Sequence, residues 1–258
     1  MLNNLPPDLI KLTKNATWEQ VTEGESDADV YRLRADSVRY LKISSSKAQY
    51  PAKNDYLRLK WLTGKLPTPD ILYYQEDKQY HYLLMSDCAG LHPLHDDLQW
   101  TAQTRLDVLL EAVQIFHALP IDDCPYRMGF DEQIALARHN IDYDLVRIDF
   151  WEEEHIGRDI EDLFAEFVAL RPQQEDWVLT HGDMYPINIR VAKQSQKITG
   201  FIDVGAMAVA DSYTDLVCLS NAIGWHHGSL WVDRFWTQLG SPINEKKLRF
   251  YKLFREFI

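Results

Sequence analysis

The spacing of apolar residues changes along this chain, from alternation in the N-terminal part to helical spacing further on. Residues 30–34 and 39–43 alternate between apolar and polar side chains, which predicts strands with one buried face. Residues 80–85 predict another strand, and residues 50–64 predict a helix that ends at Gly64. The N-terminal part is therefore expected to be mainly β.

After residue 100 the pattern becomes helical. Residues 101–119 carry an apolar stripe that predicts a helix facing a core. The stripe consists of Leu106, Leu109, Leu110, Val113 and Phe116. Residues 130–145 and 214–223 predict two more helices. Together with the strands before them, these helices indicate an α+β protein whose C-terminal part is mainly α.

One stretch carries acids and an amide in an order that suits phosphoryl transfer. Asp183 is followed five residues later by Asn188, and Asp203 follows fifteen residues after that. Residues 177–180 and 197–202 predict flanking strands, so the first two side chains are expected on a loop and the third just past a strand end. In this chemistry one carboxylate orients or accepts the proton of the attacking hydroxyl, while an Asn and a second Asp hold the metal. The sequence therefore predicts Asp183 as the base and Asn188 with Asp203 as metal ligands.

Each of these residues also has an ordinary structural interpretation. A single acid in a loop is more often a turn former or a helix cap, but the ordered set of three is much harder to obtain by chance. His181 is expected to pack and to hydrogen-bond the loop backbone. His226 and His227 are adjacent, so their side chains would diverge on a helix, and no third ligand is evident. We expect these two to be surface residues or substrate-loop residues, without a metal.

Composition limits the partners. The formal net charge is −12, from 27 basic and 39 acidic residues. Such a charge argues against nucleic acid and against an anionic membrane, and it suits a cationic small molecule.

The three cysteines and the hydropathy of the chain indicate the compartment. Cys88, Cys124 and Cys218 are far apart and odd in number, which argues against a disulfide framework and a zinc site. Residues 1–14 lack the pattern of a signal peptide, and no apolar run is long enough to span a bilayer. A cytoplasmic protein is therefore expected.

The motifs of the catalytic stretch resemble those of the aminoglycoside phosphotransferases, especially the 3′-phosphotransferase (kanamycin kinase) branch. The matching elements are His181-Gly182-Asp183, Asn188, Ile202-Asp203-Val204-Gly205, Asp211 and Asp215-Leu216. The resemblance runs from about Val21 to the C-terminus and implies a bilobal protein-kinase-like fold. It implies a nucleotide-binding lobe over residues 1–85 and a catalytic, acceptor-binding lobe over residues 86–258.

The resemblance also implies the activity. Members of this family transfer the γ-phosphate of a nucleoside triphosphate to a sugar hydroxyl of an aminoglycoside antibiotic, which gives antibiotic resistance. The implied cofactors are ATP or GTP and Mg²⁺, and the implied partner is a cationic small molecule.

Five nucleotide-binding positions follow from the resemblance. Ser26 falls in the loop that covers the phosphates, and Lys42 falls where a strand lysine contacts the α- and β-phosphates. Tyr40 matches a position against the adenine ring. Ser86 and Cys88 match the hinge, whose backbone binds adenine.

The helix partner of the lysine departs from the family. The family has a Glu where this chain has Asp55, which is one methylene shorter. The resemblance therefore implies an ion pair with Lys42 that is longer or needs the helix to move. From the strand pattern alone, Lys42 is expected to be solvated.

A run of acids between residues 149 and 162 has two interpretations. Such runs are usually solvated helix faces. In the resembled family, however, the matching segment forms an acidic lid that holds a polyamine sugar, and acids and the terminal carboxylate at the C-terminus help to bind it. The implied substrate residues are Asp149, Glu152, Glu153, Glu256 and Ile258.

Departures from the family gather at the acceptor positions. Pro186 stands where an acid is common, and Ala206 where Arg is common. Gly224-Trp225-His226 replaces a charged loop, Arg255 replaces an acid, and Ile258 replaces a terminal Phe. The nucleotide and metal positions therefore match the family better than the acceptor positions do. Alternatives are a kinase of another small hydroxylated metabolite or antibiotic, with a choline-like or macrolide acceptor, and a catalytically weak kinase-like binding protein.

Overall fold

A computed structural model describes residues 5–22, 28–48 and 50–258. The chain forms two compact units. The first comprises Met1–Gln99 with Ile187–Met207, and the second comprises Trp100–Pro186 with Ala208–Ile258. The borders of these units differ from the expected lobe border after residue 85, so the assignment of one function to each continuous lobe stays a prediction.

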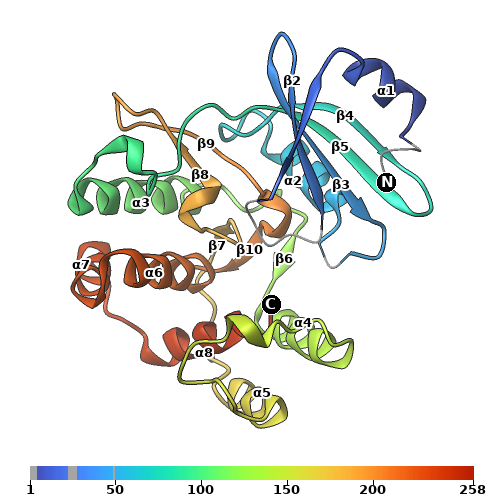
Figure 1. Cartoon of the computed structure of the whole chain (residues 1–258). Helices are drawn as coiled ribbons and strands as arrows, with labels where there is room; N and C mark the ends of the chain where they lie inside the picture. The colour runs from blue at the N-terminus through green and yellow to red at the C-terminus, as the bar shows by residue number, and fades with distance from the viewer. Residues whose placement is uncertain (1–4, 23–27, 49) are drawn as a thin grey trace. The chain divides into compact units, whose positions relative to one another are not determined.

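The first unit is built on a five-stranded antiparallel sheet in the order β1-β2-β3-β5-β4 (Figure 1). The strands are β1 (Thr17–Val21), β2 (Asp29–Arg34), β3 (Val38–Ser45), β4 (Ile71–Glu76) and β5 (Tyr80–Ser86). Those expected at 30–34, 39–43 and 80–85 are confirmed. β3 and β5 lie inside the sheet and each bury four consecutive side chains, from Leu41 to Ser44 and from His81 to Leu84, so both of their faces are covered.

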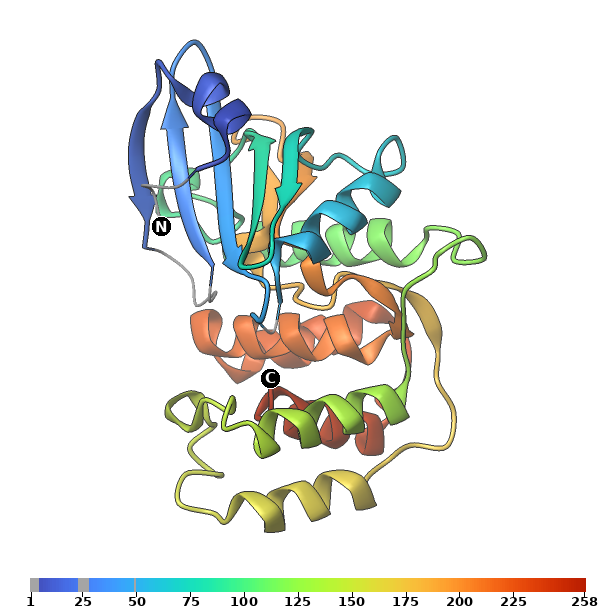
Figure 2. The same ribbon diagram turned by 90° about the vertical axis from the view of Figure 1, so that its right-hand side faces the viewer.

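Two helices flank this sheet, α1 (Pro7–Thr13) and α2 (Ala52–Leu62), and Figure 2 shows them on its opposite sides. On the α1 side, Leu9 joins a core of buried side chains that consists of Leu33, Leu41, Ile43, Tyr82 and Leu84. On the α2 side, Ser44 Oγ accepts a hydrogen bond of 2.7 Å from the backbone N–H of Ala52. Since side chains alternate along β3, Lys42 shares the face of Ser44 and is directed toward α2.

The helix expected at 50–64 is confirmed, and Gly64 after it has φ +77°, the left-handed conformation that glycine favours at a helix end.

A hairpin of β8 (Ile189–Val191) and β9 (Ile198–Phe201) belongs to the same unit. It is attached through the Phe201 N–H, which donates to Pro67 O at 2.9 Å. The 3₁₀ turns η4 (Pro186–Asn188) and η5 (Val204–Ala206) precede and follow the hairpin, and η5 packs on α2. The functional stretch after residue 186 is thereby fixed to the first unit.

The second unit contains a three-stranded sheet in the order β6-β10-β7 and most of the helices. The strands are β6 (Arg127–Met128), β7 (Trp177–Thr180) and β10 (Ala208–Asp211). The helices are α3 (Ala102–His117), α4 (Phe130–Asp142), α5 (Ile160–Ala169), α6 (Tyr213–His227), α7 (Ser229–Leu239) and α8 (Glu245–Arg255). Of the helices in the described part of the chain, none is long and apolar enough to cross a membrane.

The three helices expected from periodicity are confirmed as α3, α4 and α6. The loop considered for residues 224–228 is wrong, while Trp225 and His226 are exposed as surface residues. Helix α6 continues through Trp225 to His227 and ends at Gly228, which has φ +85°. Gly224 is tolerated inside the helix because α7 packs closely there, and a Cβ on it would lie 3.3 Å from Val232.

Helix α8 holds the second unit together through aromatic side chains. Phe250 stacks on Phe167 of α5 with ring centroids 4.5 Å apart, and it meets Phe130 of α4 edge-on at 5.2 Å. All three side chains are fully buried. The residues at the C-terminal end of α8, Arg255 and Glu256, are therefore fixed by a packed helix.

Candidate active site

A buried ion-pair cluster occupies the α2 side of the first sheet. The Lys42 ammonium lies 2.9 Å from Asp55 Oδ2 and 2.8 Å from Asp203 Oδ1. Lys42 is only 7% exposed and Asp55 only 3%, whereas the Asp203 side chain is 45% exposed. The expectation of a solvated lysine is wrong, because the register of β3 directs Lys42 at α2. The expectation of a longer ion pair is also wrong, since Asp55 reaches the ammonium directly.

The charge on Lys42 is stabilised by its two carboxylates. Burial alone lowers the pKa of Lys42, but the charges of Asp55 and Asp203 and their hydrogen bonds raise it well above its usual range. Burial raises the pKa of Asp55, and the Lys42 ammonium opposes that rise. The cluster therefore presents a permanent cation next to the half-exposed Asp203 carboxylate.

The close packing of Gly205 explains how the shorter Asp55 fits. A Cβ on Gly205 would lie 3.1 Å from both carboxylate oxygens of Asp55. Arg58, one turn further along α2, donates to Met207 O at 3.0 Å. Helix α2 and the turn η5 thus approach each other closely enough for an aspartate to span the distance to Lys42.

Asn188 and Asp203 are positioned by neighbouring strand ends. The backbone carbonyl of Asn188 accepts a hydrogen bond of 2.9 Å from the N–H of Ile202, the residue before Asp203. Asp203 has φ +56° and ψ +49°, a conformation that few residues other than glycine adopt and that occurs often at functional sites. This backbone turn directs the carboxylate to Lys42 and leaves it partly exposed.

The donor set of this unit suits a metal that a nucleotide helps to bind. In the residues that the structure describes, no three His, Cys, Asp or Glu side chains lie together as a ready-made metal site. Asn188 and Asp203 offer an amide oxygen and a carboxylate, which are hard ligands. Because Mg²⁺ commonly takes one or two protein oxygens and completes its shell with phosphates and water, this pair fits such an ion.

The positions expected near adenine have their own contacts. The Tyr40 hydroxyl accepts a hydrogen bond of 3.0 Å from Arg32 Nε, and the Ser86 hydroxyl accepts one of 2.8 Å from the Asp70 N–H. Cys88 is half-buried against Gly200, and burial raises the pKa of its thiol to about 11. Ser26 lies outside the described residues.

Asp183 belongs to the second unit, on the loop after β7. Its side chain is 42% exposed, and Oδ1 lies 3.5 Å from Arg255 Nη1. The Cys218 thiol lies 3.9 Å from the same oxygen. His181 is fully buried beside Phe116, and its Nδ1 accepts a hydrogen bond of 3.3 Å from the Asp183 N–H. The structural role expected for His181 is confirmed.

Asp215 anchors the loop that carries Asp183. Its fully buried carboxylate accepts the N–H groups of His181 at 2.9 Å and Gly182 at 3.0 Å. His117 Nε2 lies 3.0 Å from the same carboxylate. The sequence motif included Asp215 but assigned it no role. The contact of His117 with Asp215 was not predicted, because the two residues are 98 positions apart. The position of His117 in the last turn of α3 was the only local signal for it.

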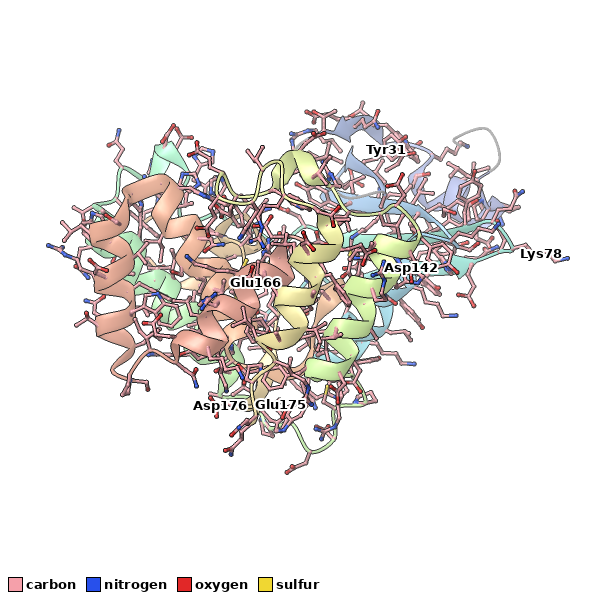
Figure 3. All side chains as sticks on the ribbon, turned by 90° about the horizontal axis from the view of Figure 1, so that it is seen from below. Tyr31, Lys78, Asp142, Glu166, Glu175 and Asp176 are labelled. Atoms are coloured by element: carbon pink, nitrogen blue, oxygen red, sulfur yellow. The ribbon has the colours of Figure 1, made fainter. Side chains whose placement is uncertain are left out.

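Asp211 has a similar anchoring function. Its carboxylate accepts the N–H groups of Asp176 at 2.8 Å and Tyr213 at 3.0 Å, and it pairs with Lys247 of α8. Lys247 also contacts Asp176 at 2.7 Å, in the segment before β7 (Figure 3). Burial raises the pKa of Asp211, and the Lys247 ammonium opposes the rise. This acid therefore supports the fold beneath the loop.

The acid-rich segment is tied to the C-terminal residues. Glu256 is 5% exposed, its Oε1 lies 2.8 Å from His155 Nδ1, and its carboxylate accepts the Glu152 N–H at 3.3 Å. Burial raises the pKa of Glu256, and the hydrogen bond with His155 opposes the rise. Asp149 and Glu153 are exposed.

The segment is only partly the helix face that such runs usually form. Asp149 lies in the short 3₁₀ turn η3 (Ile148–Phe150), and Asp159 caps the N-terminus of α5. Glu161 and Asp162 alone stand in the first turn of that helix. The acids before residue 159 therefore lie on irregular backbone next to the C-terminal end of α8.

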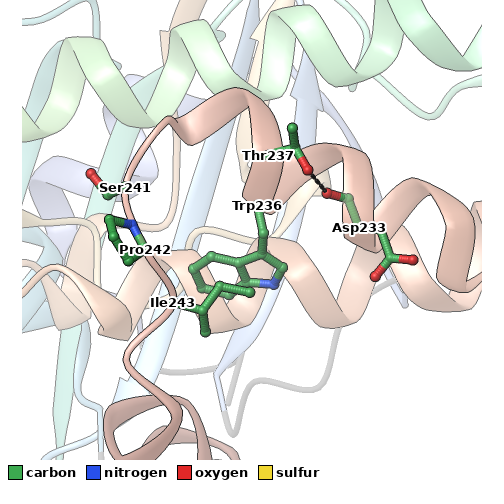
Figure 4. A pocket seen from close by; sticks show the side chains of 6 residues that line it. All are labelled: Asp233, Trp236, Thr237, Ser241, Pro242 and Ile243. Atoms are coloured by element: carbon green, nitrogen blue, oxygen red, sulfur yellow. Dashed lines mark hydrogen bonds between the residues drawn. The ribbon is translucent and has the colours of Figure 1, made fainter.

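A separate surface groove lies beside α7, with a volume of about 320 Å³ (Figure 4). It is lined by Asp233, Trp236, Thr237, Ser241, Pro242 and Ile243. Trp236 is buried and donates a hydrogen bond of 3.1 Å to Ser220 Oγ. No site residue expected from the described sequence lines this groove.

Comparison with known proteins gives the family. The model of the phosphotransferase enzyme family matches residues 17–251. The chain belongs to this family. It is 30% identical over 261 residues to an aminoglycoside 3′-phosphotransferase of Enterococcus faecalis, with 98% of this chain and 97% of the relative covered. The resemblance to aminoglycoside phosphotransferases that the motifs carry is therefore confirmed.

Solved structures of the phosphotransferase family confirm the expected fold. An aminoglycoside 3′-phosphotransferase of type VIII matches with a TM-score of 0.85 and 27% identity, covering 97% of both chains. The aminoglycoside phosphotransferase APH(3″)-Id of Streptomyces rimosus, solved with ADP and streptomycin, matches with a TM-score of 0.82 and 25% identity, covering 96% of this chain and 95% of that one. The kinase-like α+β architecture, with an antiparallel N-terminal sheet and a helical C-terminal part, is thus shared with them.

Proposed function

We propose that this protein transfers the γ-phosphate of ATP or GTP to a hydroxyl group of an aminoglycoside, and so gives antibiotic resistance. The observation that carries the proposal is the Lys42 ammonium held between Asp55 and Asp203 at 2.9 and 2.8 Å. Phosphoryl transfer needs such a cation at the phosphates together with a metal-holding acid. The relatives named above, one of them solved with ADP and streptomycin, support the same reaction class.

The nucleotide would be bound by the first unit. Lys42 would contact the α- and β-phosphates, and Asp55 would keep its side chain in that position. Tyr40, Ser86 and Cys88 would lie along the adenine, with Ser26 on the phosphates. Since Lys42 is buried and its charge stabilised, it is pre-organised for an anion without losing conformational freedom on binding.

Mg²⁺ would be held by Asn188 and Asp203 together with the nucleotide phosphates. When bound, such an ion neutralises charge that develops on the transferred phosphoryl group. Asp203 accepts a hydrogen bond from Lys42 through Oδ1, which would orient its carboxylate for the ion.

Asp183 would act on the acceptor. Its half-exposed carboxylate would orient the attacking hydroxyl and accept its proton as the new O–P bond forms. The buried Asp215 would hold the loop N–H groups so that Asp183 keeps one position.

The acid-rich segment would bind the amino groups of the acceptor. Asp149, Glu152 and Glu153 would supply carboxylates, and Ile258 would lie at the edge of the site. Glu256 is buried against His155, so it would act by holding this segment in place. The net charge of −12 favours a polycation as the acceptor.

A coupled assay of ADP release tests the proposal, with ATP and GTP compared across aminoglycosides, a macrolide, choline and no acceptor. Release that depends on an aminoglycoside is expected, and it should weaken as salt rises because charge pairs at the surface are screened. Release that is fastest with a neutral acceptor would leave a kinase of another substrate. No release with any compound would leave a kinase-like binding protein.

A further inference from the structure

Arg255 places a positive charge beside Asp183, although the proposed acceptor is itself a cation. It is the last residue of α8, and its Nη1 lies 3.5 Å from Asp183 Oδ1. Its side chain is 31% exposed and that of Asp183 is 42% exposed, so both reach solvent at the same place. The packed aromatic residues of α8 fix the backbone that carries Arg255.

The charge balance at this point depends on Arg255. Cys218 also approaches Asp183, but burial raises the pKa of its thiol to about 12, so it contributes no charge at neutral pH. The guanidinium therefore offsets the charge of Asp183 locally. An acid at position 255 would instead place two negative charges side by side and attract a cation.

Hydrogen bonding sharpens the distinction. A guanidinium has five N–H donors and no acceptor, and an ammonium group likewise only donates. An acceptor hydroxyl can accept a hydrogen bond from Arg255 while another hydroxyl faces Asp183. An ammonium in the same place would meet both a like charge and an unmatched donor, and like charges in contact discriminate strongly against a ligand.

We propose that Arg255 determines acceptor specificity: the enzyme prefers aminoglycosides whose reacting ring carries hydroxyl groups where related compounds carry ammonium groups. This inference rests on the proposed function and narrows its substrate class. The acid-rich segment still binds ammonium groups on other rings. The replacement of an acid by Arg255 affects only the acceptor ring that lies next to Asp183.

Matched antibiotic pairs test the inference. Kanamycin A and kanamycin B differ at the 2′ position, hydroxyl against amine, and paromomycin and neomycin differ in the same way at the 6′ position. For the wild-type protein, kcat/KM is expected to favour the hydroxyl member of at least one pair by about tenfold, the range in which single contacts discriminate. Arg255→Gln should bring that ratio near unity, and Arg255→Asp should reverse it.

A control variant separates the local effect from net charge. Lys252→Asp makes the same charge change on an exposed residue of α8, one turn earlier, and should leave the ratio as in the wild type. Thermal unfolding of each variant checks that α8 is intact. The ratio of kcat/KM between the hydroxyl and amine members of a pair tests the inference in the wild-type protein alone. The inference can therefore be refuted even if a variant fails to fold.

Two results distinguish the possible failures. If both members of each pair are phosphorylated equally, or the amine members better, Arg255 does not select the acceptor, although the proposed function stands. If no aminoglycoside is phosphorylated, the proposed function fails and the inference fails with it.

Discussion

A difference of one methylene group in Asp55 is accommodated by the residue that faces it. Gly205 has no side chain, and its backbone lies against the Asp55 carboxylate, which reaches Lys42 directly at 2.9 Å. The buried lysine would be costly without this partner, since a buried charge that loses its counter-ion costs about 3–5 kcal/mol. Lys42 and Asp55 therefore depend on each other for both packing and charge neutralisation.

Asp55→Glu is expected to destabilise the protein, although it restores the longer acid of the family. The extra methylene has to enter the space beside Gly205, where the carboxylate oxygens of Asp55 already lie 3.1 Å from the position that a Cβ would occupy. Overpacking of this kind costs about 1–3 kcal/mol. Urea denaturation should show a lower midpoint than in the wild type, with an unchanged slope. A midpoint at or above that of the wild type would mean that α2 moves away from η5 freely.

Asp183→Asn is expected to lower kcat by about 10²- to 10⁴-fold, because an amide cannot accept the hydroxyl proton. The first unit should be unaffected, so the Kd for ATP measured by calorimetry should stay within a factor of about two. Asp203→Asn is the matched comparison, since it should instead reduce the Mg²⁺ dependence of nucleotide binding. A wild-type kcat for Asp183→Asn would remove this residue from the mechanism.

At the scale of residues, the sequence predicted which residues belong to the candidate site better than it predicted the contacts that surround them. The order Asp183, Asn188 and Asp203 could be read because these residues lie within one short stretch. The burial of Lys42 could not, because one of its two partners, Asp203, is 161 positions away. The contact of Arg255 with Asp183 across 72 positions was equally invisible, although the residue itself was noticed.

Among the elements, the loop from His181 to Asp183 depends on helix α6. Asp215 in the first turn of α6 accepts two backbone N–H groups of the loop, and His117 from the end of α3 joins the same carboxylate. Charge-assisted bonds to a buried carboxylate are worth about 1.5–3 kcal/mol each. The position of the loop is therefore set by helices α3 and α6, which are far apart in the sequence.

Asp215→Asn is expected to lower kcat while leaving the KM for ATP nearly unchanged. The amide retains one acceptor oxygen, so one of the two loop N–H groups loses its partner and Asp183 loses its fixed position. A fall of the melting temperature should accompany the loss. The measurement is a comparison of steady-state kinetics and thermal unfolding with His117→Gln, which keeps both backbone contacts and should affect kcat less. Wild-type kcat in Asp215→Asn would show that the loop positions itself.

Helices α4 and α5 are joined by a surface link with a defined pH dependence. Arg138, which also contacts Asp142 on its own helix, donates two hydrogen bonds to Glu161 at 2.7 and 2.9 Å. These bonds lower the pKa of Glu161 below 4.5. Because the folded-state pKa is below the unfolded one, the link stabilises the fold above about pH 4.5, and this contribution is lost as the pH falls through the folded-state pKa.

The melting temperature of Glu161→Gln should therefore lie below that of the wild type at pH 7, and the two should converge as the pH falls below the lowered pKa of Glu161. Differential scanning calorimetry across this range makes the comparison. A difference that is the same above and below that pKa would show that the ionised pair does not contribute, as is the case for many exposed ion pairs.

Local sequence patterns predicted the existence of strands β2, β3 and β5 and of helices α3 and α4, although β3 and β5 are buried on both faces. The patterns failed where tertiary contacts decide. The extension of α6 through Gly224 could not be expected, because it depends on the approach of Val232 from α7. The irregular backbone of the acid-rich segment likewise follows from the contact of Glu152 with Glu256, 104 positions away.

For the whole molecule, the fold class was predictable because the spacing of apolar residues changes once along the chain, from alternation to helical spacing. The composition of the compact units was not. The hairpin of β8 and β9 is part of the first unit although it follows most of the second in sequence, because it pairs with the segment at Leu91 and Pro67. Such pairings between distant segments leave no periodic signal in either segment.

The central claim is that the chain moves a phosphoryl group from a nucleotide to an aminoglycoside hydroxyl. The most direct test is mass spectrometry of the acceptor after incubation with Mg²⁺ and ATP labelled with ¹⁸O in the γ-phosphate. We expect kanamycin A to gain one labelled phosphoryl group for each ADP formed, and Asp183→Asn to form almost none. ADP formation with an unmodified aminoglycoside, or equal phosphorylation by Asp183→Asn, would contradict the account.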